Sequence, residues 1–269
     1  MNSIITTPKG LHPHLVKTIQ DAESAGTFLA PPPKRRYTPS PPRPTPNFNE
    51  FRNILIFDTE TTGFIPTGMD PKRPSTVNLD MAPYVTQLSF VVYNTEIGHF
   101  TYLFNEYIDI PDNVDISERV TEVTGIDRDV LDAKGVPMFY ALSVFLQAVK
   151  KCDCIVAHNI AFDEKMIRYE MMRYGFCQKG VFDHVYMCCT MKMGQPICKL
   201  PSPRFDGLLK PPKLCELHTF LFDGEEVENL HNAIVDVLVC FRCFVKMAFE
   251  KHVPSEVFKQ LVDFEMEEP

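Results

Sequence analysis

Two neighbouring acids near residue 60 have the type and spacing needed to hold a divalent cation. Asp58 and Glu60 stand two residues apart at the end of the apolar run Ile54–Phe57. In extended backbone such residues project to the same side, and adjacent carboxylates repel each other when they are buried. A cation such as Mg2+ or Mn2+ removes that penalty, because these ions prefer hard oxygen ligands. A solvated pair of acids at a strand end is the alternative, and the pair alone does not decide between the two.

Two further acids and a histidine lie where such a site would need them. Asp163 follows the predicted strand Cys154–Ala157 in the first turn of a helix, and Asp236 lies in the first turns of a later helix. In an α/β sheet, the carboxyl end of a strand and the start of the next helix border the ligand crevice. His231 precedes Asp236 by five residues, a spacing that does not share one helix face, so we expect it just outside the helix. Taken singly, a first-turn acid or a lone histidine is more often an ordinary helix-start or surface residue.

Taken together, the three segments resemble the three motifs of the DEDDh 3′–5′ exonucleases. This DnaQ-like family includes polymerase proofreading subunits. The segments read Asp-x-Glu-x-x-Gly, His-Asn-x-x-Phe-Asp and His-x-Ala-x-x-Asp, and Val123–Ile126, Cys189–Met191 and Lys213–Leu214 also resemble family segments. The likeness covers about residues 52–248. It implies an α/β, RNase H-like fold, in which a five-stranded mixed sheet is flanked by helices.

The resemblance also implies a role for each motif residue in cutting phosphodiester bonds at 3′ ends. Two ions, Mg2+ or Mn2+, would be held by four acids: Asp58, Glu60, Asp163 and Asp236. His231 would be the general base, since an imidazole titrates near neutrality. The terminal nucleotide would be contacted by Thr59, Thr61, Thr62, Gly63, Asn159 and Phe162. Phe64 and Ile126 would stack on or wedge the last bases, although ordinary core packing explains these two equally well.

The family motifs leave the substrate and the partners open. The proofreading-type motifs favour single-stranded DNA over RNA as the substrate. The products would be nucleoside 5′-monophosphates. An exoribonuclease is one alternative. A second is an interaction module that keeps the fold and recruits a replication partner. The sequence gives no basis for choosing an oligomeric state.

The first 50 residues differ in composition from the rest of the chain. They hold ten of the 23 prolines and a net charge of +3, whereas the remainder carries a net charge of −11. Proline removes backbone donors and disfavours helix, which predicts a disordered arm over residues 1–50 and an exonuclease domain over residues 51–269. A solvated linker is the simpler interpretation of the arm. Docking of a polymerase or contact with nucleic acid is the alternative.

The net charge and the cysteine content indicate how the chain binds nucleic acid and where in the cell it acts. A formal charge of −8 argues against a broad nucleic-acid coat, although bound metal ions would reverse the local sign at a site. Nine irregularly spaced cysteines indicate reduced thiols, so we expect an intracellular protein, cytoplasmic or nuclear, neither secreted nor membrane-bound. A structural zinc site is an alternative use of Cys188, Cys189, Cys198, Cys215 and His218, although no Cys-x-x-Cys pair lies among these residues.

Hydrophobic periodicity predicts the elements that would position these residues. Tyr84–Tyr93 and His99–Ile108 alternate as an antiparallel hairpin, and an apolar stripe predicts a helix over Asn232–Glu250. Phe64–Ala82 is predicted to be a long functional loop beside the site, and the proline-rich Gln195–Pro212 a second loop. Both loops are long for the family, so substrate preference cannot be carried over from it.

Overall fold

The computed structural model describes residues 46–203, 205, 207–228 and 230–267. The predicted arm, residues 1–50, lies outside this range except for its last five residues. All described residues except Pro46 belong to one unit, which starts at Asn47.

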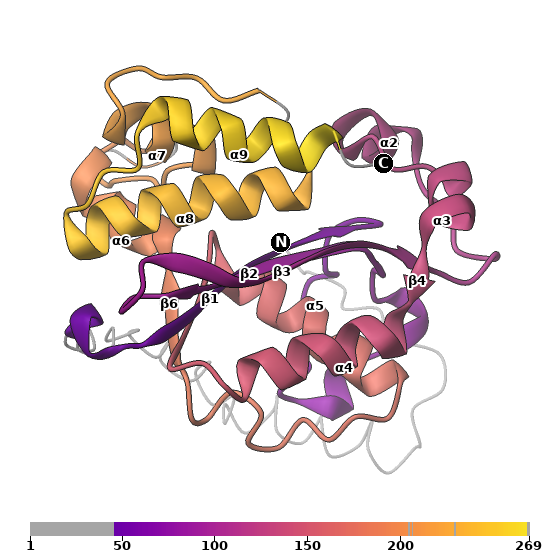
Figure 1. Cartoon of the computed structure of the whole chain (residues 1–269). Coiled ribbons are helices and arrows are strands. Elements are labelled where there is room, and N and C mark those ends of the chain that lie inside the picture. Colours follow the sequence, from indigo (N-terminus) through magenta and orange to yellow (C-terminus); the bar gives the residue numbers. More distant parts are fainter. Residues whose placement is uncertain (1–45, 204, 206, 229, 268–269) are drawn as a thin grey trace, which may run out of the picture. The chain divides into compact units, whose positions relative to one another are not determined.

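A mixed six-stranded sheet forms the centre of this unit (Figure 1). Its strands lie in the order β4-β3-β2-β1-β5-β6. Their bounds are β1 Asn53–Thr61, β2 Val85–Asn94, β3 His99–Asp109, β4 Val136–Pro137, β5 Cys154–Ala157 and β6 Tyr186–Cys189. The pairs β1–β2 and β2–β3 are antiparallel, whereas β1–β5, β5–β6 and β3–β4 are parallel. The expected five strands are therefore present, and the two-residue β4 adds a sixth at the edge.

Strand β1 is an inner strand because it is apolar on both faces. All four residues of Ile54–Phe57 are fully buried. Leu55 and Phe57 face one core cluster, whereas Ile54 and Ile56 face the other. Because side chains alternate along a strand, Asp58 and Glu60 continue the face of Ile54 and Ile56. The sequence of β1 thus sends both acids to one side of the sheet.

Helices cover both faces of the sheet (Figure 1). One face is covered by α4 (Met138–Val149) and α5 (Ile160–Arg173). The other face carries α6 (Thr190–Cys198), α7 (Leu214–Leu221), α8 (Ala233–Phe249) and α9 (Ser255–Glu267). Two shorter helices, α2 (Glu118–Thr124) and α3 (Arg128–Lys134), follow β3, and three 3-10 helices span Phe48–Glu50, Pro74–Thr76 and Leu79–Met81. No helix in the described part of the chain is both long and apolar enough to span a bilayer.

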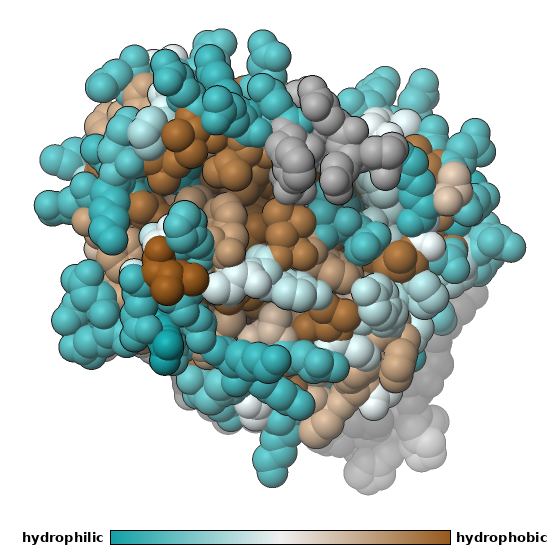
Figure 2. All heavy atoms as spheres, in the orientation of Figure 1, coloured by the Kyte–Doolittle hydropathy of each residue, from teal (hydrophilic) through white to brown (hydrophobic). Residues whose placement is uncertain are grey.

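The outer edge of β3 lies on the face drawn in Figure 2, where apolar side chains gather centrally within a hydrophilic rim. Strand β4 pairs with β3 at Ile108 and Asp109. Tyr102 and Leu103 on β3 are exposed large hydrophobic residues. Since β2 and β3 separate β1 from this edge, the acids of β1 lie in the interior of the sheet rather than at its border.

The predicted loop over Gln195–Pro212 is wrong at its start. Helix α6 continues through Gln195 and Pro196 and ends at Cys198. Pro196 removes one helical hydrogen bond and its ring crowds the carbonyl four residues earlier, yet only two residues of the helix follow it. Lys199 then ends the helix in the left-handed conformation, with φ 50°. The connection to α7 is therefore shorter than its proline content suggests.

The folded unit also begins earlier than the predicted boundary at residue 51. Phe48 is 6% exposed and packs edge-on against Phe244 of α8, with ring centroids 5.2 Å apart. It also contacts Tyr186 of β6 at 6.3 Å. An aromatic ring in this position belongs to the core, so the predicted arm ends before Asn47.

Phe48→Ala should lower the free energy of unfolding by about 3 kcal/mol, because truncating a buried aromatic ring removes its packing and leaves a cavity. Urea denaturation measures the change. The exposed neighbour Asn49 provides the control, and Asn49→Ala should shift the value by less than about 0.5 kcal/mol. Equal shifts in the two variants would contradict a core role for Phe48.

Candidate active site

Four carboxylates from three elements lie near enough to interact electrostatically at the end of β1, although only Glu60 and Asp236 of the four have ligand atoms within 4.8 Å of one another and of His231. Asp58 and Glu60 project from β1 toward the face that carries α8. Asp236 lies in the first turn of α8, and Asp163 lies in the first turn of α5, where it is 3% exposed. Carboxylates that are far apart in the sequence thus interact electrostatically in the fold.

Burial raises the pKa of all four acids, and repulsion from neighbouring carboxylates adds to the shift for Asp58, Glu60 and Asp163. Burial is the main cause for Asp58, whose pKa lies well above its ordinary value, and the charges of Asp163, Asp236 and Glu60 add to the shift. Burial, followed by the charges of Asp236 and Asp163, raises the pKa of Glu60 to about 8. Burial raises the pKa of Asp236 to about 7, against a hydrogen bond from the backbone of His231. These groups resist being charged together without a cation.

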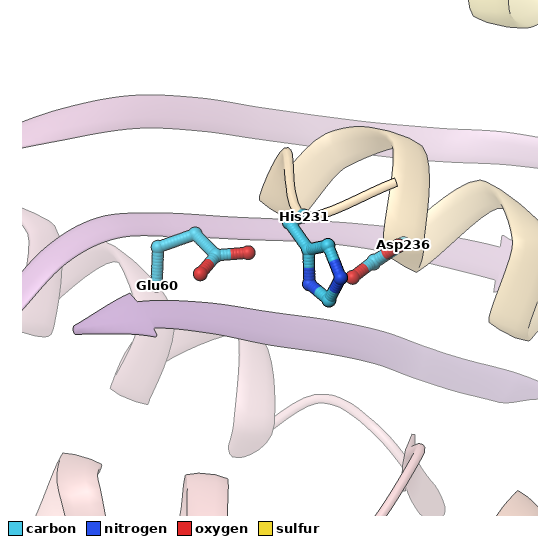
Figure 3. A group of neighbouring side chains, drawn as sticks. All are labelled: Glu60, His231 and Asp236. Carbon is cyan, nitrogen blue, oxygen red and sulfur yellow. The ribbon is translucent and has the colours of Figure 1, made fainter. Parts of the chain in front are cut away.

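Glu60, His231 and Asp236 lie close enough together to share one cation. Ligand atoms of Glu60, His231 and Asp236 all lie within 4.8 Å of one another. Figure 3 shows the imidazole of His231 between the two carboxylates. In addition, Oδ1 of Asp236 is buried and has no hydrogen-bond partner. A buried unpaired carboxylate oxygen beside raised carboxyl pKa values fits a divalent cation, which would satisfy the oxygen and offset the repulsion.

The alternative zinc site is not formed in the described part of the chain. The cysteines are free, and they do not come together with His218 as a group of metal ligands. The imidazole of His218 instead bonds the carbonyl of Glu225 at 3.1 Å and Arg242 at 2.9 Å. His218 is therefore part of a buried ion-pair network between α7, α8 and the segment that follows α7.

Thr59 does not offer its side chain to a nucleotide. It lies on the opposite face of β1 from Asp58 and is 6% exposed. Its hydroxyl donates a 2.9 Å hydrogen bond to Oδ1 of Asp163. Burial raises the pKa of Asp163 to about 7, and this bond opposes the shift by favouring the carboxylate. Thr59 thus orients one of the four acids, a role that the motif spacing did not indicate.

The two motif histidines have different environments. His231 is exposed, precedes the α8 cap residue Asn232 and adopts φ 70°. It lies just outside the helix, as its spacing from Asp236 predicts. His158 instead has both ring nitrogens engaged, with the hydroxyl of Thr190 at 3.0 Å and the carbonyl of Pro212 at 3.1 Å. Burial lowers the pKa of His158 to about 4, so it stays neutral and ties the segment before α7 to the sheet.

The turn after β1 opens onto a hollow of about 460 Å³. The Thr61 hydroxyl donates to the carbonyl of Gly63 at 2.8 Å, and Phe64 is 90% exposed. Thr62 and Tyr84 join the two ends of the following loop through bonds of 2.9 and 3.0 Å. The hollow is lined by residues 62–64, 80–84 and 113–115. An exposed ring at the rim of such a hollow is available to stack on a base.

The predicted loop Phe64–Ala82 is anchored on α5 rather than loose. Lys72 forms a 2.8 Å ion pair with Glu164, the residue after Asp163. Arg173 donates to the carbonyl of Leu79 at 3.2 Å and to that of Ala82 at 2.5 Å. The loop therefore forms a fixed wall of the hollow.

The remaining predicted nucleotide contacts divide into exposed and buried residues. Asn159 is exposed, adopts φ 67° at the start of α5 and makes no capping bond with its side chain. Phe162 is partly buried against the core. Ile126 is 1% exposed and belongs to the core cluster, so core packing is the correct interpretation for this residue. Asn159 is thus free to contact a ligand, whereas Ile126 is not.

Metal-free protein should become less stable as the pH rises. Between ordinary values near 4 and the raised values of about 7 to 8, the folded carboxyl groups keep protons that the unfolded chain has lost. Because the folded state binds more protons in this window, the free energy of unfolding falls with increasing pH. Thermal melts in EDTA from pH 5 to 9 measure the effect.

Saturating Mn2+ should restore most of the lost stability at pH 8.5 and change little at pH 5. Burial also raises the pKa of Glu170, to about 7, and this group contributes a slope of the same sign outside the cluster. The Mn2+-dependent part of the slope therefore isolates the four acids. A slope that Mn2+ leaves unchanged would contradict the assignment.

The chain is similar in sequence to an exonuclease family and to a DNA polymerase subunit. The profile of the RNase_T family, described as Exonuclease, matches residues 55–244. DNA polymerase III subunit epsilon of Buchnera aphidicola subsp. Baizongia pistaciae (strain Bp) is 23% identical over 194 residues, which cover 72% of this chain and 69% of the relative.

Solved structures show the same fold at low sequence identity. E. coli exonuclease I in complex with a 5cy-dT13 oligonucleotide superposes with a TM-score of 0.57 at 18% identity, over 79% of this chain and 43% of that one. Cell-death related nuclease 4 gives 0.54 at 15% identity, over 74% and 64%. This chain thus covers less than half of the exonuclease I chain. The fold is RNase H-like, as the motifs implied, and the chain belongs to the RNase_T exonuclease family.

Proposed function

We propose that this protein is a metal-dependent 3′–5′ exonuclease that releases nucleoside 5′-monophosphates from single-stranded DNA. The carrying observation is the cluster of four acids with raised pKa values, drawn from β1, α5 and α8, beside the exposed imidazole of His231. Such a cluster is costly unless cations occupy it. The free-energy cost of burying these four acids together is therefore best explained by a role in binding metal ions for catalysis.

Each residue of the cluster has a distinct part in the proposed reaction. Two ions, Mg2+ or Mn2+, would be held by Asp58, Glu60, Asp163 and Asp236. When bound, they would supply an activated water and stabilise charge on the attacking and leaving oxygens. An imidazole nitrogen of His231 would take the proton from that water, which its exposed position allows. The hydroxyl of Thr59 would hold Asp163 in its ligating orientation.

The turn after β1 would position the 3′-terminal nucleotide. Thr61, Thr62 and Gly63 follow Glu60 directly. The exposed side chains of Phe64 and Asn159, and the partly buried ring of Phe162, would also contact the strand end. Stacking on Phe64 would tolerate any base, since every base has a π-face, and is worth about 1–3 kcal/mol. The solved complexes of E. coli exonuclease I with dT13 and dA16 oligonucleotides support DNA as the substrate class.

Labelled oligonucleotides test the proposal. A single strand labelled at its 5′ end should shorten as a ladder with Mg2+ or Mn2+, whereas a 3′ label should be released at once as a mononucleotide. EDTA should stop both reactions. No shortening with either metal would end the proposal, and cleavage of circular single strands would indicate an endonuclease instead.

Matched DNA and RNA strands separate the two substrate classes. The proposal expects faster degradation of DNA, and a preference for RNA would replace it with an exoribonuclease. Recruitment of a polymerase through the N-terminal arm is a separate proposal on residues outside the described range. The weak likeness to a polymerase III subunit is its support. Truncation before Asn47 should keep nuclease activity and lose co-purification with the polymerase.

A further inference from the structure

Gln87 on β2 lies beside the acids without being one of them. It pairs with Glu60 across the β1–β2 ladder, and Ser89 pairs with Asp58. Directly paired residues project to the same face of a sheet, so Gln87 faces the α8 side. Gln87 is 1% exposed. A buried carboxamide needs hydrogen-bond partners, and those partners reveal what it holds.

The partners of Gln87 lie at the start of α8. Its Oε1 accepts from the backbone N–H of Ala233 at 3.1 Å, and its Nε2 donates to Oδ1 of Asn232 at 3.4 Å. The same Nε2 donates to Oδ1 of Asn105 on β3 at 2.9 Å. Ser89 also donates to Oδ1 of Asn105, at 2.7 Å. The carboxamide is thus oriented from β3 and presents its oxygen to the helix.

The first N–H groups of a helix have no partner within the helix. Asn232 caps α8 by accepting from Ile234 at 3.2 Å, and Gln87 accepts from the N–H of Ala233. Together they fix the rotation of the first turn relative to the sheet. Asp236 follows within that turn, and His231 directly precedes the cap. The sheet thereby sets where both side chains point.

His231 depends on this anchor more than an ordinary loop residue would. Its φ of 70° is a conformation that non-glycine residues adopt infrequently. Farther back along the same connection, Glu225 is held by Arg242 of α8 at 2.8 Å. Next to His231 itself, the contacts of Gln87 hold the chain to the sheet.

We propose that Gln87 is a positioning residue that sets the placement of His231 and Asp236 through the start of α8. The inference rests on the proposed nuclease function. Gln87 touches neither substrate nor metal; it acts through the backbone of Ala233 and the side chain of Asn232. Removing the carboxamide frees the first turn and leaves a buried N–H without a partner, while Glu60 and Asp58 stay on β1.

Gln87→Met, which keeps the length of the side chain and removes its polar atoms, should lower kcat about 10- to 100-fold with KM for the oligonucleotide changed less than twofold. A double-mutant cycle then tests how Gln87 acts. In a His231→Asn background, Gln87→Met should cost several-fold less than in the wild type, because the part of its effect that acts through His231 is already lost and only the part through Asp236 remains. Additive losses would overturn the proposal.

Asn94 provides a matched control on the same strand. It is 9% exposed and donates to Asn53 at 2.9 Å, at the opposite end of β2 from Gln87. Asn94→Ala should lower the melting temperature as Gln87→Met does, yet change kcat less than twofold. If both variants lose activity equally, Gln87 has only a structural role. Gln87→Asn shortens the amide out of reach of Ala233 and replaces the Met variant if that one does not fold.

A readout without catalysis keeps this inference distinct from the nuclease proposal. Calorimetric titration with Mn2+ should show about tenfold weaker binding in Gln87→Met and unchanged binding in Asn94→Ala, because Asp236 shifts only in the first. Unchanged Mn2+ affinity in Gln87→Met would overturn the proposal. A wild-type protein that binds Mn2+ but cuts no oligonucleotide would end the nuclease function alone.

Discussion

Asp58→Asn should slow oligonucleotide hydrolysis at least about a thousandfold, yet raise the melting temperature of the metal-free protein at pH 8. The loss is expected because the site would lose a metal ligand, and metal stabilisation of the transition state contributes several kcal/mol. The gain is expected because the substitution removes one charge from a repelling cluster while keeping the side-chain volume. Gel assays with Mg2+ and thermal melts in EDTA measure the two effects.

A fall in activity together with a rise in melting temperature distinguishes an active-site acid from a structural one. Asp58 has its pKa raised first by burial and then by Asp163, Asp236 and Glu60, so its ionised form is unfavourable in the folded state without a cation. Asp129, exposed at the start of α3, is the control, and Asp129→Asn should change neither property by much. A parallel fall of activity and stability in Asp58→Asn would argue that Asp58 is a structural acid.

His231→Asn should lower kcat about a thousandfold and leave Mn2+ affinity within about threefold. General base catalysis typically contributes 10²- to 10⁴-fold, which sets the expected magnitude. Asparagine is chosen because it accepts the left-handed backbone of this position more readily than alanine, so the start of α8 is preserved. Exposed His99, at the start of β3, provides the control substitution His99→Asn, which should leave kcat unchanged.

The position of the imidazole makes this experiment decisive. Its nitrogen lies within 4.8 Å of ligand atoms on Glu60 and Asp236, a distance that also suits a metal ligand (Figure 3). A base loses turnover without losing metal when it is replaced, whereas a ligand loses both. Loss of one Mn2+ equivalent in His231→Asn would therefore reassign the residue as a ligand.

The sequence predicts the parts of this site that depend on local pattern. The run Ile54–Phe57 identifies an inner strand, and alternation along it sends Asp58 and Glu60 to one face. Helix-start signals place Asp163 and Asp236 in first turns. These inferences use only the repeat of strand or helix, so they need no tertiary contact.

Features that depend on contacts between distant residues could not be predicted from the sequence pattern. The bond from Thr59 to Asp163 spans 104 residues, and the bond from Ala233 to Gln87 spans 146. Phe48 lies in proline-rich sequence, and only its packing against Phe244 shows that it belongs to the core. Nothing local distinguishes these side chains from solvated ones, because their partners are set by the fold.

The long segment between β1 and β2 is closed at its base by the bonds between Thr62 and Tyr84. Lengthening this loop would destabilise the fold only slightly, since the entropic cost of closing a loop grows with the logarithm of its length. Residues between Thr62 and Tyr84 can therefore be inserted or deleted without displacing Asp58 or Glu60. The fold thus separates the acids on β1 from the loop that lines one side of the hollow, so the substrate range can be changed by replacing that loop alone.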